Sequence, residues 1–403
     1  DGTGSHSVIS SEGNTEGDWV GIIAKYDGNV DLQNARIKHA EVGVQFDNAF
    51  PGLSRIEDSH FEGNAVDIKV DYGSNPTQGP RAGTGSPLIK NSTFVVGTQY
   101  GIHIAGHSNE ATIEGNTFKG ANDSIAGILL DANTGTPHIE ANTMGSSGFS
   151  TGAVLLIKGG EATVEKNTFS DSKYGIHVLA NGTAIAAPKI GSGVASSDNF
   201  LKDNTSNGLR VEGKNAKPEV RNNQISGNAV AGILTLRKGA PWLGVSGDDA
   251  DNSIWNNGLY CIWNRDNSFA IQTTGNWFGS CVAPSCTNGF VQIHSWHCSQ
   301  PASFGGPEIA LESTPATGLV LSSNPVVVGT MISYSNPEKV EDLEYSIVDI
   351  SGRLVKRIPS AFDGSAFWDG STQRGARASR GIYFIRALSG GKVLEQQKLV
   401  LTK

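Results

Sequence analysis

The hexamer Ile113-Glu114-Gly115-Asn116-Thr117-Phe118 recurs in one frame through the first three-quarters of this chain. Further copies occupy residues 56–61, 89–94, 139–144, 164–169 and 220–225, with starts 33, 24, 26, 25 and 56 residues apart. The last gap fits two turns, and a second short apolar strand such as Gly127-Ile128 follows each copy. A period of short strands without helical spacing predicts a β-solenoid, in which each coil buries its inward side chains against its neighbours.

The fourth position of the hexamer is always a small polar residue. It reads Ser59, Ser92, Asn116, Asn142, Asn167 and Asn223. Stacked coils would bring these side chains into register at one corner, where they satisfy backbone groups that the bend leaves without partners. We therefore predict a ladder with a structural role.

The composition supports an all-β fold. Glycine contributes 51 of 403 residues and charged residues only 17 %, against a usual ~25 % charged. The net charge of −8 and the lack of a Lys/Arg cluster argue against nucleic acid as a partner. No apolar run approaches the ~18–20 residues of a membrane span.

Residues 240–300 are rich in Trp and Cys, as expected of a cap over the last coil. They hold five of the seven tryptophans and all four cysteines, Cys261, Cys281, Cys286 and Cys298. An even number of cysteines in one short stretch predicts disulfides and an oxidising compartment. A short loop closed by Cys281–Cys286, leaving Cys261–Cys298, is one of three pairings, and the spacing does not fit zinc.

The repeat, together with Gly17-Asp18-Trp19 and Gly275-Asn276-Trp277-Phe278-Gly279, resembles the right-handed parallel β-helix proteins of the pectate-lyase-like superfamily. The resemblance covers roughly residues 1–300 and implies a right-handed parallel β-helix solenoid. The superfamily includes polysaccharide lyases, epimerases, glycosidases, adhesins and phage fibres, so the resemblance leaves the function open.

A second domain is predicted after a Pro/Ser/Thr/Gly-rich linker at residues 301–318. Alternating strand-length segments over residues 319–403 predict a small C-terminal β-sandwich, immunoglobulin-like in kind. Asn324-Pro325, Trp368-Asp369-Gly370, Gly381-Ile382-Tyr383-Phe384 and the ending Lys398-Leu399-Val400-Leu401-Thr402-Lys403 resemble the C-terminal sorting domain of the type IX secretion system. That resemblance implies export to the cell surface or exterior of a Gram-negative bacterium.

Side chains that follow the Gly-Ile pairs should form one outer face, because side chains alternate along a strand. Near its N-terminal end this face would gather the polar residues Asp67, Lys69, Asp71, His103 and His107. A polysaccharide lyase would use such a set, with carboxylates holding Ca²⁺ against a uronate and a Lys or His removing the C5 proton. A solvated surface with ordinary ion pairs is the favoured interpretation.

Further along, the same face is predicted to carry an apolar stripe of Leu129, Leu155, Ile157, Leu179, Leu234 and Leu236. Soluble proteins rarely expose so large a patch. We expect the insertions at residues 181–198 and 238–251 to cover it, with a partner surface or a second copy of the chain as the alternative.

Two further motifs receive structural interpretations. Tyr-Gly-Ile-His at residues 100–103 and 174–177 should recur three coils apart, too distant for a joint site. The acidic run Asp248-Asp249-Ala250-Asp251-Asn252 could take Ca²⁺ but lacks the Gly and terminal Glu of an EF-hand loop, so we expect an acidic turn and no cofactor.

The favoured hypothesis is an exported, non-enzymatic protein with a structural, adhesive or glycan-binding role, including self-association through its solenoid. The alternative is a lyase or epimerase acting on uronate-containing glycans. A glycoside hydrolase ranks last, because Asp67 and Asp71, four residues apart on one strand, would lie roughly 13 Å apart.

Overall fold

A computed structural model describes residues 7–10, 13, 15–25, 28–47, 54–72, 87–106, 110–120, 124–131, 135–144, 148–180, 182–192, 198–266, 268–281, 284–301, 319–321, 330–334, 343–360, 365–390 and 392–402. The chain divides into two compact units, Asp1–Gly306 and Pro307–Lys403. The ordered elements of both units are strands, and none of the described residues is helical. The all-β prediction is confirmed, and the described residues contain no helix that could span a membrane.

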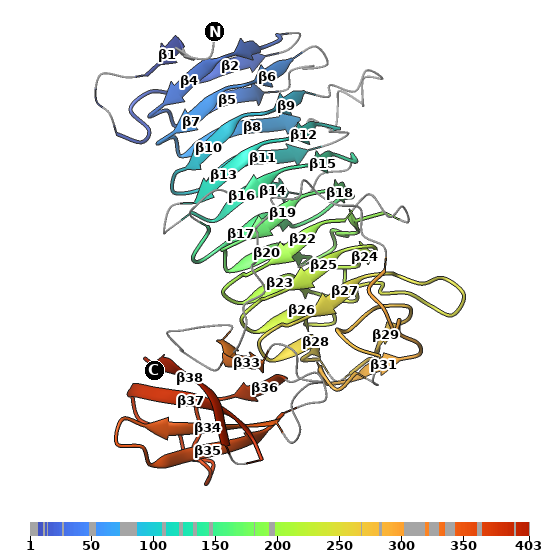
Figure 1. Ribbon diagram of the computed structural model, residues 1–403. Coiled ribbons are helices and arrows are strands. Elements are labelled where there is room, and N and C mark those ends of the chain that lie inside the picture. The colour runs from blue at the N-terminus through green and yellow to red at the C-terminus, as the bar shows by residue number, and fades with distance from the viewer. Residues whose placement is uncertain are drawn as a thin grey trace. The chain divides into compact units, whose positions relative to one another are not determined.

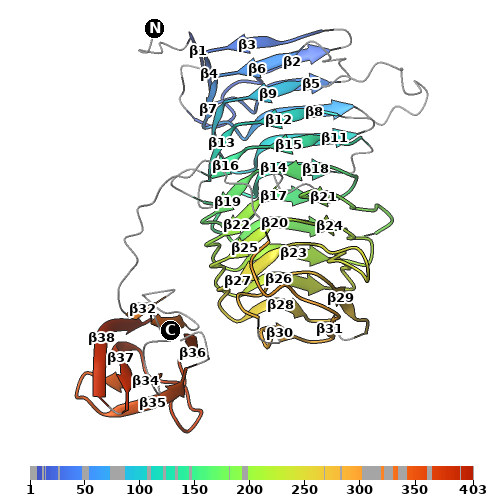
Figure 2. The same ribbon diagram turned by 45° about the vertical axis from the view of Figure 1, so that its right-hand side comes forward.

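The first unit is a solenoid whose coils stack from the blue N-terminal end to the yellow coils (Figure 1). Three parallel sheets form its walls (Figure 2). The ten-stranded sheet contains β1 (Ser7–Ile9), β4 (Ala35–Lys38), β7 (His60–Glu62), β10 (Thr93–Val96), β13 (Thr117–Gly120), β16 (Thr143–Met144), β19 (Thr168–Ser170), β22 (Phe200–Lys202), β25 (Gln224–Ser226) and β27 (Ser253–Trp255).

The eleven-stranded sheet contains β2 (Ile22–Lys25), β5 (Val42–Asp47), β8 (Val66–Tyr72), β11 (Tyr100–Gly106), β14 (Ala126–Asp131), β17 (Ala153–Ile157), β20 (Tyr174–Leu179), β23 (Asn207–Glu212), β26 (Ala231–Leu236), β28 (Tyr260–Asn264) and β30 (Thr287–Asn288). The eight-stranded sheet contains β3 (Asp31–Gln33), β6 (Arg55–Glu57), β9 (Leu88–Lys90), β12 (Thr112–Glu114), β15 (His138–Glu140), β18 (Thr163–Glu165), β21 (Lys189–Ile190) and β24 (Glu219–Val220).

Each hexamer makes the bend from the eight-stranded to the ten-stranded sheet. Its first residue lies in the former and its last in the latter, as with Ile113 in β12 and Phe118 in β13. The third position takes the left-handed conformation, with φ of 54° at Ala141 and 57° at Lys166. That one residue turns the strand sharply, which explains why Asn, Asp and Gly are common there.

The inward hexamer residues form the core. Phe61, Phe94 and Phe118 are fully buried, and their rings stack with centroids 5.1 Å apart from coil to coil. This spacing is close to the ~4.8 Å between neighbouring strands, so each ring lies directly on the next and apolar burial is continuous along the solenoid.

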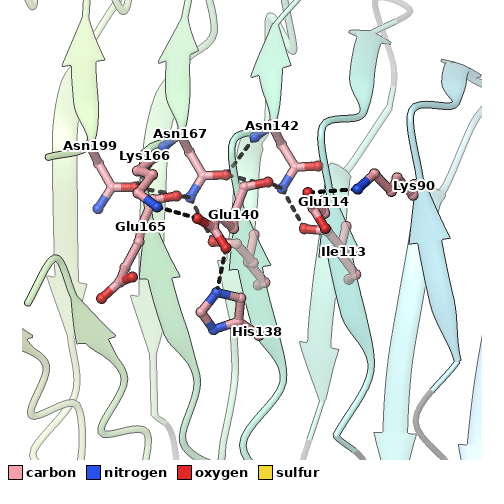
Figure 3. A network of polar contacts seen from close by, with 11 residues as sticks. Lys90, Ile113, Glu114, His138, Glu140, Asn142, Glu165, Lys166, Asn167 and Asn199 are labelled. Atoms are coloured by element: carbon pink, nitrogen blue, oxygen red, sulfur yellow. Dashed lines mark hydrogen bonds and ion pairs between the residues drawn. The ribbon is translucent and has the colours of Figure 1, made fainter. Parts of the chain in front are cut away.

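The predicted ladder is confirmed at the first bend (Figure 3). Nδ2 of Asn142 donates to Oδ1 of Asn167 at 3.0 Å, and Nδ2 of Asn167 donates to Oδ1 of Asn199 at 2.9 Å. The ladder starts with Ser59 and Ser92 and continues to Asn276. These fully buried amides replace the partners that the bend removes from the backbone.

The last coils are closed by β29 (Ile271–Thr273) and β31 (Val291–Ile293), which pair in parallel. Disulfides join Cys261 to Cys286 and Cys281 to Cys298. Disulfides are confirmed, but the pairing of Cys281 with Cys286 is wrong. Cys261 is the second residue of β28, which pairs with β30, and Cys286 immediately precedes β30. Stacking of the two strands therefore brings the cysteines together although 25 residues separate them.

The second unit consists of two antiparallel sheets. One contains β32 (Leu319–Leu321), β33 (Thr330–Tyr334) and β36 (Ser365–Trp368). The other contains β35 (Leu354–Pro359), β34 (Leu343–Asp349), β37 (Gly381–Ser389) and β38 (Lys392–Leu401). Trp368, Tyr345 and Ile385 are fully buried in its own core. The predicted Asn324-Pro325 motif lies outside the described residues.

Candidate functional site

The outer face of the eleven-stranded sheet carries two rows of side chains in register. The first row is Gln45, Lys69, His103, Leu129, Leu156, His177, Arg210, Leu234 and Trp263. The second includes Asp71, Ala105 and Asp131, and further on Leu179, Glu212 and Leu236. His103 and His177 are three strands apart along the first row, as predicted.

Asp67 does not lie on this face. It is the second residue of β8, level with Gly43 of β5 and fully buried, and its Oδ1 accepts a hydrogen bond from Asn64 at 2.9 Å. Its Oδ2 has no hydrogen-bond partner in the described part of the chain. Burial raises the pKa of Asp67 well above its usual value, so this carboxyl group cannot serve as the predicted Ca²⁺-binding carboxylate.

Lys69, Asp71 and His103 do come together on β8 and β11. Nζ of Lys69 lies 3.3 Å from Oδ2 of Asp71, and His103 is the register partner of Lys69. Burial lowers the pKa of His103, outweighing the carboxylate of Asp131. His107 lies outside the described residues.

The predicted apolar stripe is partly wrong. Leu155 and Ile157 are fully buried in the core, and Leu156 faces outward in register with Leu129. The predicted stripe treats Ala153-Val154 as a Gly-Ile pair, whereas Leu155 is the register partner of Ile128. This shift of one residue exchanges the two faces of the strand.

The remaining members of the stripe do face outward, but they are not freely exposed. Leu129 is 1 % exposed and Leu234 4 %, whereas Leu179 and Leu236 are half-buried. The insertions predicted to cover them contribute Ala186 and Leu243 to the main core.

The acidic run contacts basic side chains of neighbouring segments. Asp248 forms an ion pair with Arg221 at 2.7 Å, and Asp251 contacts His297 at 2.7 Å. Ligand atoms of Asp249, Asp251 and His297 lie within 4.8 Å of one another. Asp248 and Asp251 are therefore paired, and the trio of Asp249, Asp251 and His297 is the one group of three possible metal ligands among the described residues.

The most distinctive polar cluster surrounds Glu212, at the end of β23. Nε and Nη2 of Arg210 donate to its Oε2 at 3.0 and 2.7 Å, and Nη1 of Arg237 lies 2.9 Å from its Oε1. Nη1 of Arg210 also donates to the Tyr174 hydroxyl at 2.8 Å, and His177 Nε2 lies 3.4 Å from Oε2. Three successive strands, β20, β23 and β26 with the turn after it, therefore meet at one carboxylate.

Charge and burial define the protonation states of this cluster. Burial raises the pKa of Glu212, but the hydrogen bond and charge of Arg210 outweigh it and leave the pKa below its usual value. Burial and the charge of Arg210 lower the pKa of His177 to about 4. At neutral pH the cluster thus holds an ionised carboxylate, two guanidinium groups and a neutral imidazole.

The charges of the eight-stranded sheet offer a contrast (Figure 3). There Glu140 pairs with Lys166 and His138, and Lys90 pairs with Glu114, on the outer wall. The Glu140 side chain is 24 % exposed, compared with 7 % for Glu212. Surface pairs of the first kind contribute ~0–1 kcal/mol and are common, whereas an ion cluster screened from water needs complete pairing.

The sequence analysis missed this cluster. Arg210 and Glu212 lie two residues apart at outward positions, which alternation alone could have indicated. The contributions of Tyr174 and Arg237 depend on coil register and on the turn after β26, for which the sequence carries no comparable signal.

Comparisons with known proteins identify the fold family. The family model described as "Right handed beta helix region" matches residues 2–144 and 81–244. The chain therefore belongs to this family of right-handed β-helix proteins. No curated protein sequence matches it.

Three solved structures are similar to parts or all of the chain. Tailspike protein 2 (enzymatically active domain) of bacteriophage CBA120 is 11 % identical, over 98 % of this chain and 72 % of that chain, with a TM-score of 0.36. A double-mutant tailspike protein of E. coli bacteriophage HK620 is 11 % identical, over 98 % and 85 %, with a TM-score of 0.33. Dimeric latent PorU from Porphyromonas gingivalis is 23 % identical, over 21 % of this chain and 9 % of that chain, with a TM-score of 0.18. TM-scores this low transfer no function to the chain.

Proposed function

We propose that this chain is an exported β-helix protein that binds polysaccharide along the outer face of its eleven-stranded sheet, in a structural or adhesive role. The observation that carries the proposal is the Glu212 cluster. Screening an ionised carboxylate from water is costly unless it is fully paired. Because the inward side chains already supply a continuous core, this arrangement is better explained by a need for a rigid polar surface.

The side chains beside the cluster suit a sugar. The ring of Tyr174 lies under Arg210 at 5.1 Å, and further along the same face the rings of Tyr260 and Trp263 are 5.1 Å apart. Tyr174 is buried beneath Arg210, so the rings that a sugar could contact are those of Tyr260 and Trp263. Flat rings beside oriented polar groups are typical of small-ligand and sugar-binding surfaces. The hydrogen bond that Nη1 of Arg210 donates to the Tyr174 hydroxyl fixes the position of the tyrosine side chain.

Binding fits the protonation states better than catalysis does. Both carboxylate oxygens of Glu212 contact guanidinium groups, and its lowered pKa makes it a poor proton donor at neutral pH. A glycoside hydrolase needs one carboxyl group with a raised pKa beside a second carboxylate. A histidine with a pKa of about 4 is likewise a weak base.

Glycan binding by the full-length chain tests the proposal. A glycan array identifies a ligand, and titration then compares the wild type with Glu212→Gln, which leaves the guanidinium groups without their carboxylate. We expect a loss of at least about tenfold in affinity. Glu140→Gln, which removes a paired carboxylate from the eight-stranded sheet, is the matched control and should bind normally. Absence of any glycan binding, or equal losses in both variants, contradicts the proposal.

A lyase or epimerase is the second candidate, favoured by the contact of Lys69 with Asp71 and by the neutral His103 next to them. Lys69 would remove the C5 proton of a uronate. Rising ultraviolet absorbance of the unsaturated product on pectate, alginate or glycosaminoglycans, lost in Lys69→Ala, would establish a lyase. A lack of turnover on all three rejects that version.

Export and self-association belong to the same proposal. Two disulfides support an oxidising compartment. We propose that the C-terminal sandwich serves type IX sorting to the exterior or surface of a Gram-negative bacterium. In a host with that system the intact chain should leave the cell, whereas a chain lacking β38 should not. Size-exclusion chromatography tests self-association, and a monomer at every concentration contradicts it.

A further inference from the structure

A hollow of about 360 Å³ lies beside the Glu212 cluster. Four successive coils line it with residues that come just after their strands in the eleven-stranded sheet. Gly182 follows β20, Gly213 and Lys214 follow β23, Arg237 and Lys238 follow β26, and Asp266 follows β28. Its volume is at the lower end of the ~300–1,000 Å³ usual for ligand sites, enough for one or two sugar rings.

The lining is strongly cationic in a chain of net charge −8. Lys214, Arg237 and Lys238 face a single carboxylate, that of Asp266. Hydrogen bonds from the Ser268 side chain and backbone lower the pKa of Asp266 and keep it ionised. Since Arg237 is paired with Glu212, Lys214 and Lys238 oppose the carboxylate of Asp266 and leave an excess of one positive charge at this open depression.

Arg237 links the hollow to the Glu212 cluster. One guanidinium nitrogen is fixed against Glu212 at 2.9 Å, yet the side chain is 70 % exposed. Its other donors are free of that contact and can meet a ligand. A guanidinium held at one edge is already oriented for a planar acid group, which reduces the entropy lost on binding.

The turn after β26 that carries Arg237 and Lys238 has an unusual backbone conformation. Arg237 and Lys238 both have left-handed φ values, 51° and 66°. This conformation costs roughly 1–2 kcal/mol for each residue other than glycine. The neighbouring coils use Gly182 and Gly213, with φ of 100° and 102°, at the same edge. The turn leaves the side chains of Arg237 and Lys238 exposed, and both line the hollow.

We propose that this hollow binds the acid group of a polysaccharide, the carboxylate of a uronate or a sulfate ester. The inference rests on the proposed glycan-binding function and adds the ligand class and the residues that select it. Arg237 would hold two oxygens of the acid group, and Lys214 and Lys238 would supply longer-range attraction.

The test compares binding of the full chain to polygalacturonate, dextran sulfate and neutral dextran. The double variant Lys214→Gln/Lys238→Gln removes two charges without touching Glu212. We expect the wild type to bind at least one acidic polymer more tightly than neutral dextran, and the preferred polymer shows whether the site selects a carboxylate or a sulfate. The variant should lose at least about tenfold in affinity, or about 1.4 kcal/mol. The binding should also weaken as salt is added.

The matched control is Lys189→Gln/Lys217→Gln, an equal charge change on exposed lysines that do not line the hollow. Equal losses in the two double variants overturn the proposal, because they indicate only a net-charge effect. Equally tight binding of single-stranded DNA, lost in the same variant, overturns the polysaccharide assignment. Neutral dextran bound as well as the acidic polymers overturns this inference but leaves the proposed function standing, and no binding to any polysaccharide or glycan overturns both.

Discussion

Removal of one amide from the asparagine ladder should destabilise the solenoid severely. Oδ1 of Asn167 accepts hydrogen bonds from the backbone and side-chain nitrogens of Asn142 at 2.9 and 3.0 Å, and its Nδ2 donates to the Ile139 carbonyl at 2.8 Å. All these atoms are buried. In Asn167→Ala, the Asn142 N–H and the Ile139 carbonyl lose their partners, at about 1–3 kcal/mol each, so we expect a loss of about 2–6 kcal/mol.

The chain itself supplies the matched comparison. Ser92 occupies the same ladder position, where its Oγ accepts the Ser59 N–H at 3.1 Å. Asn167→Ser should therefore keep one of the two backbone hydrogen bonds and lose about half as much, roughly 1–3 kcal/mol. Lys166→Ala, at the adjacent exposed residue, should change stability by less than about 1 kcal/mol. Ala141 has almost the same φ as Lys166, so this control adds no strain.

Urea unfolding followed by tryptophan fluorescence measures the three variants. Every tryptophan except Trp368 lies in the first unit, so the signal reports chiefly on the solenoid. We expect midpoints in the order Lys166→Ala, Asn167→Ser, Asn167→Ala, from high to low, because stability falls linearly with denaturant. Equal midpoints for Asn167→Ala and Lys166→Ala would refute a structural role of the ladder.

Three further outcomes follow from buried or crowded groups. Burial raises the pKa of Asp67 above 3.8 in the folded protein, so the carboxyl group loses its proton at a lower pH in the unfolded chain than in the folded one. Between these two pKa values, rising pH should therefore lower the free energy of unfolding by up to about 1.4 kcal/mol per pH unit. Asp67→Asn should remove this slope, and parallel stability–pH curves for the two proteins would contradict it. The two disulfides close separations of 25 and 17 residues, and reducing them should lower the free energy of unfolding by about 3 kcal/mol for each bond. Reduction should also shift the tryptophan fluorescence of the cap, and unfolding with and without dithiothreitol measures both effects. A Cβ at Gly101 would lie 2.7 Å from the Gly127 carbonyl oxygen, so Gly101→Ala should lower the midpoint by an equivalent of about 1–3 kcal/mol. Gly182→Ala in the same unit has φ of 100° and no heavy atom within 4 Å, so it tests backbone strain alone and separates the two causes.

The coil architecture could be predicted because its signals are local and repeated. Each hexamer carries an aliphatic residue, a turn residue, a ladder residue and a large apolar residue within six positions, and Ile113 and Phe118 are indeed fully buried. Stacking then repeats these contacts between neighbouring coils. A misjudged loop length of a few residues between two hexamers does not change these stacking contacts.

The outer face was harder to predict because a one-residue shift exchanges it with the core. The second residue of β17 is Val154, where the neighbouring strands β14 and β20 have glycine, and this misplaced Leu155 and Ile157. Asp67 occupies the equivalent second position of β8, where the side chain is buried whatever its polarity.

The sequence by itself determined the all-β solenoid, its corner ladder and the presence of a second β unit, since these depend on periodic residues acting over one coil. Only the tertiary structure decided the disulfide partners, the burial of Asp67 and the meeting of Tyr174, Arg210, Glu212 and Arg237. Those features join residues from different coils, and such contacts depend on loop lengths, strand register and turn conformation together. A sequence pattern describes one coil at a time, whereas this site exists only between coils.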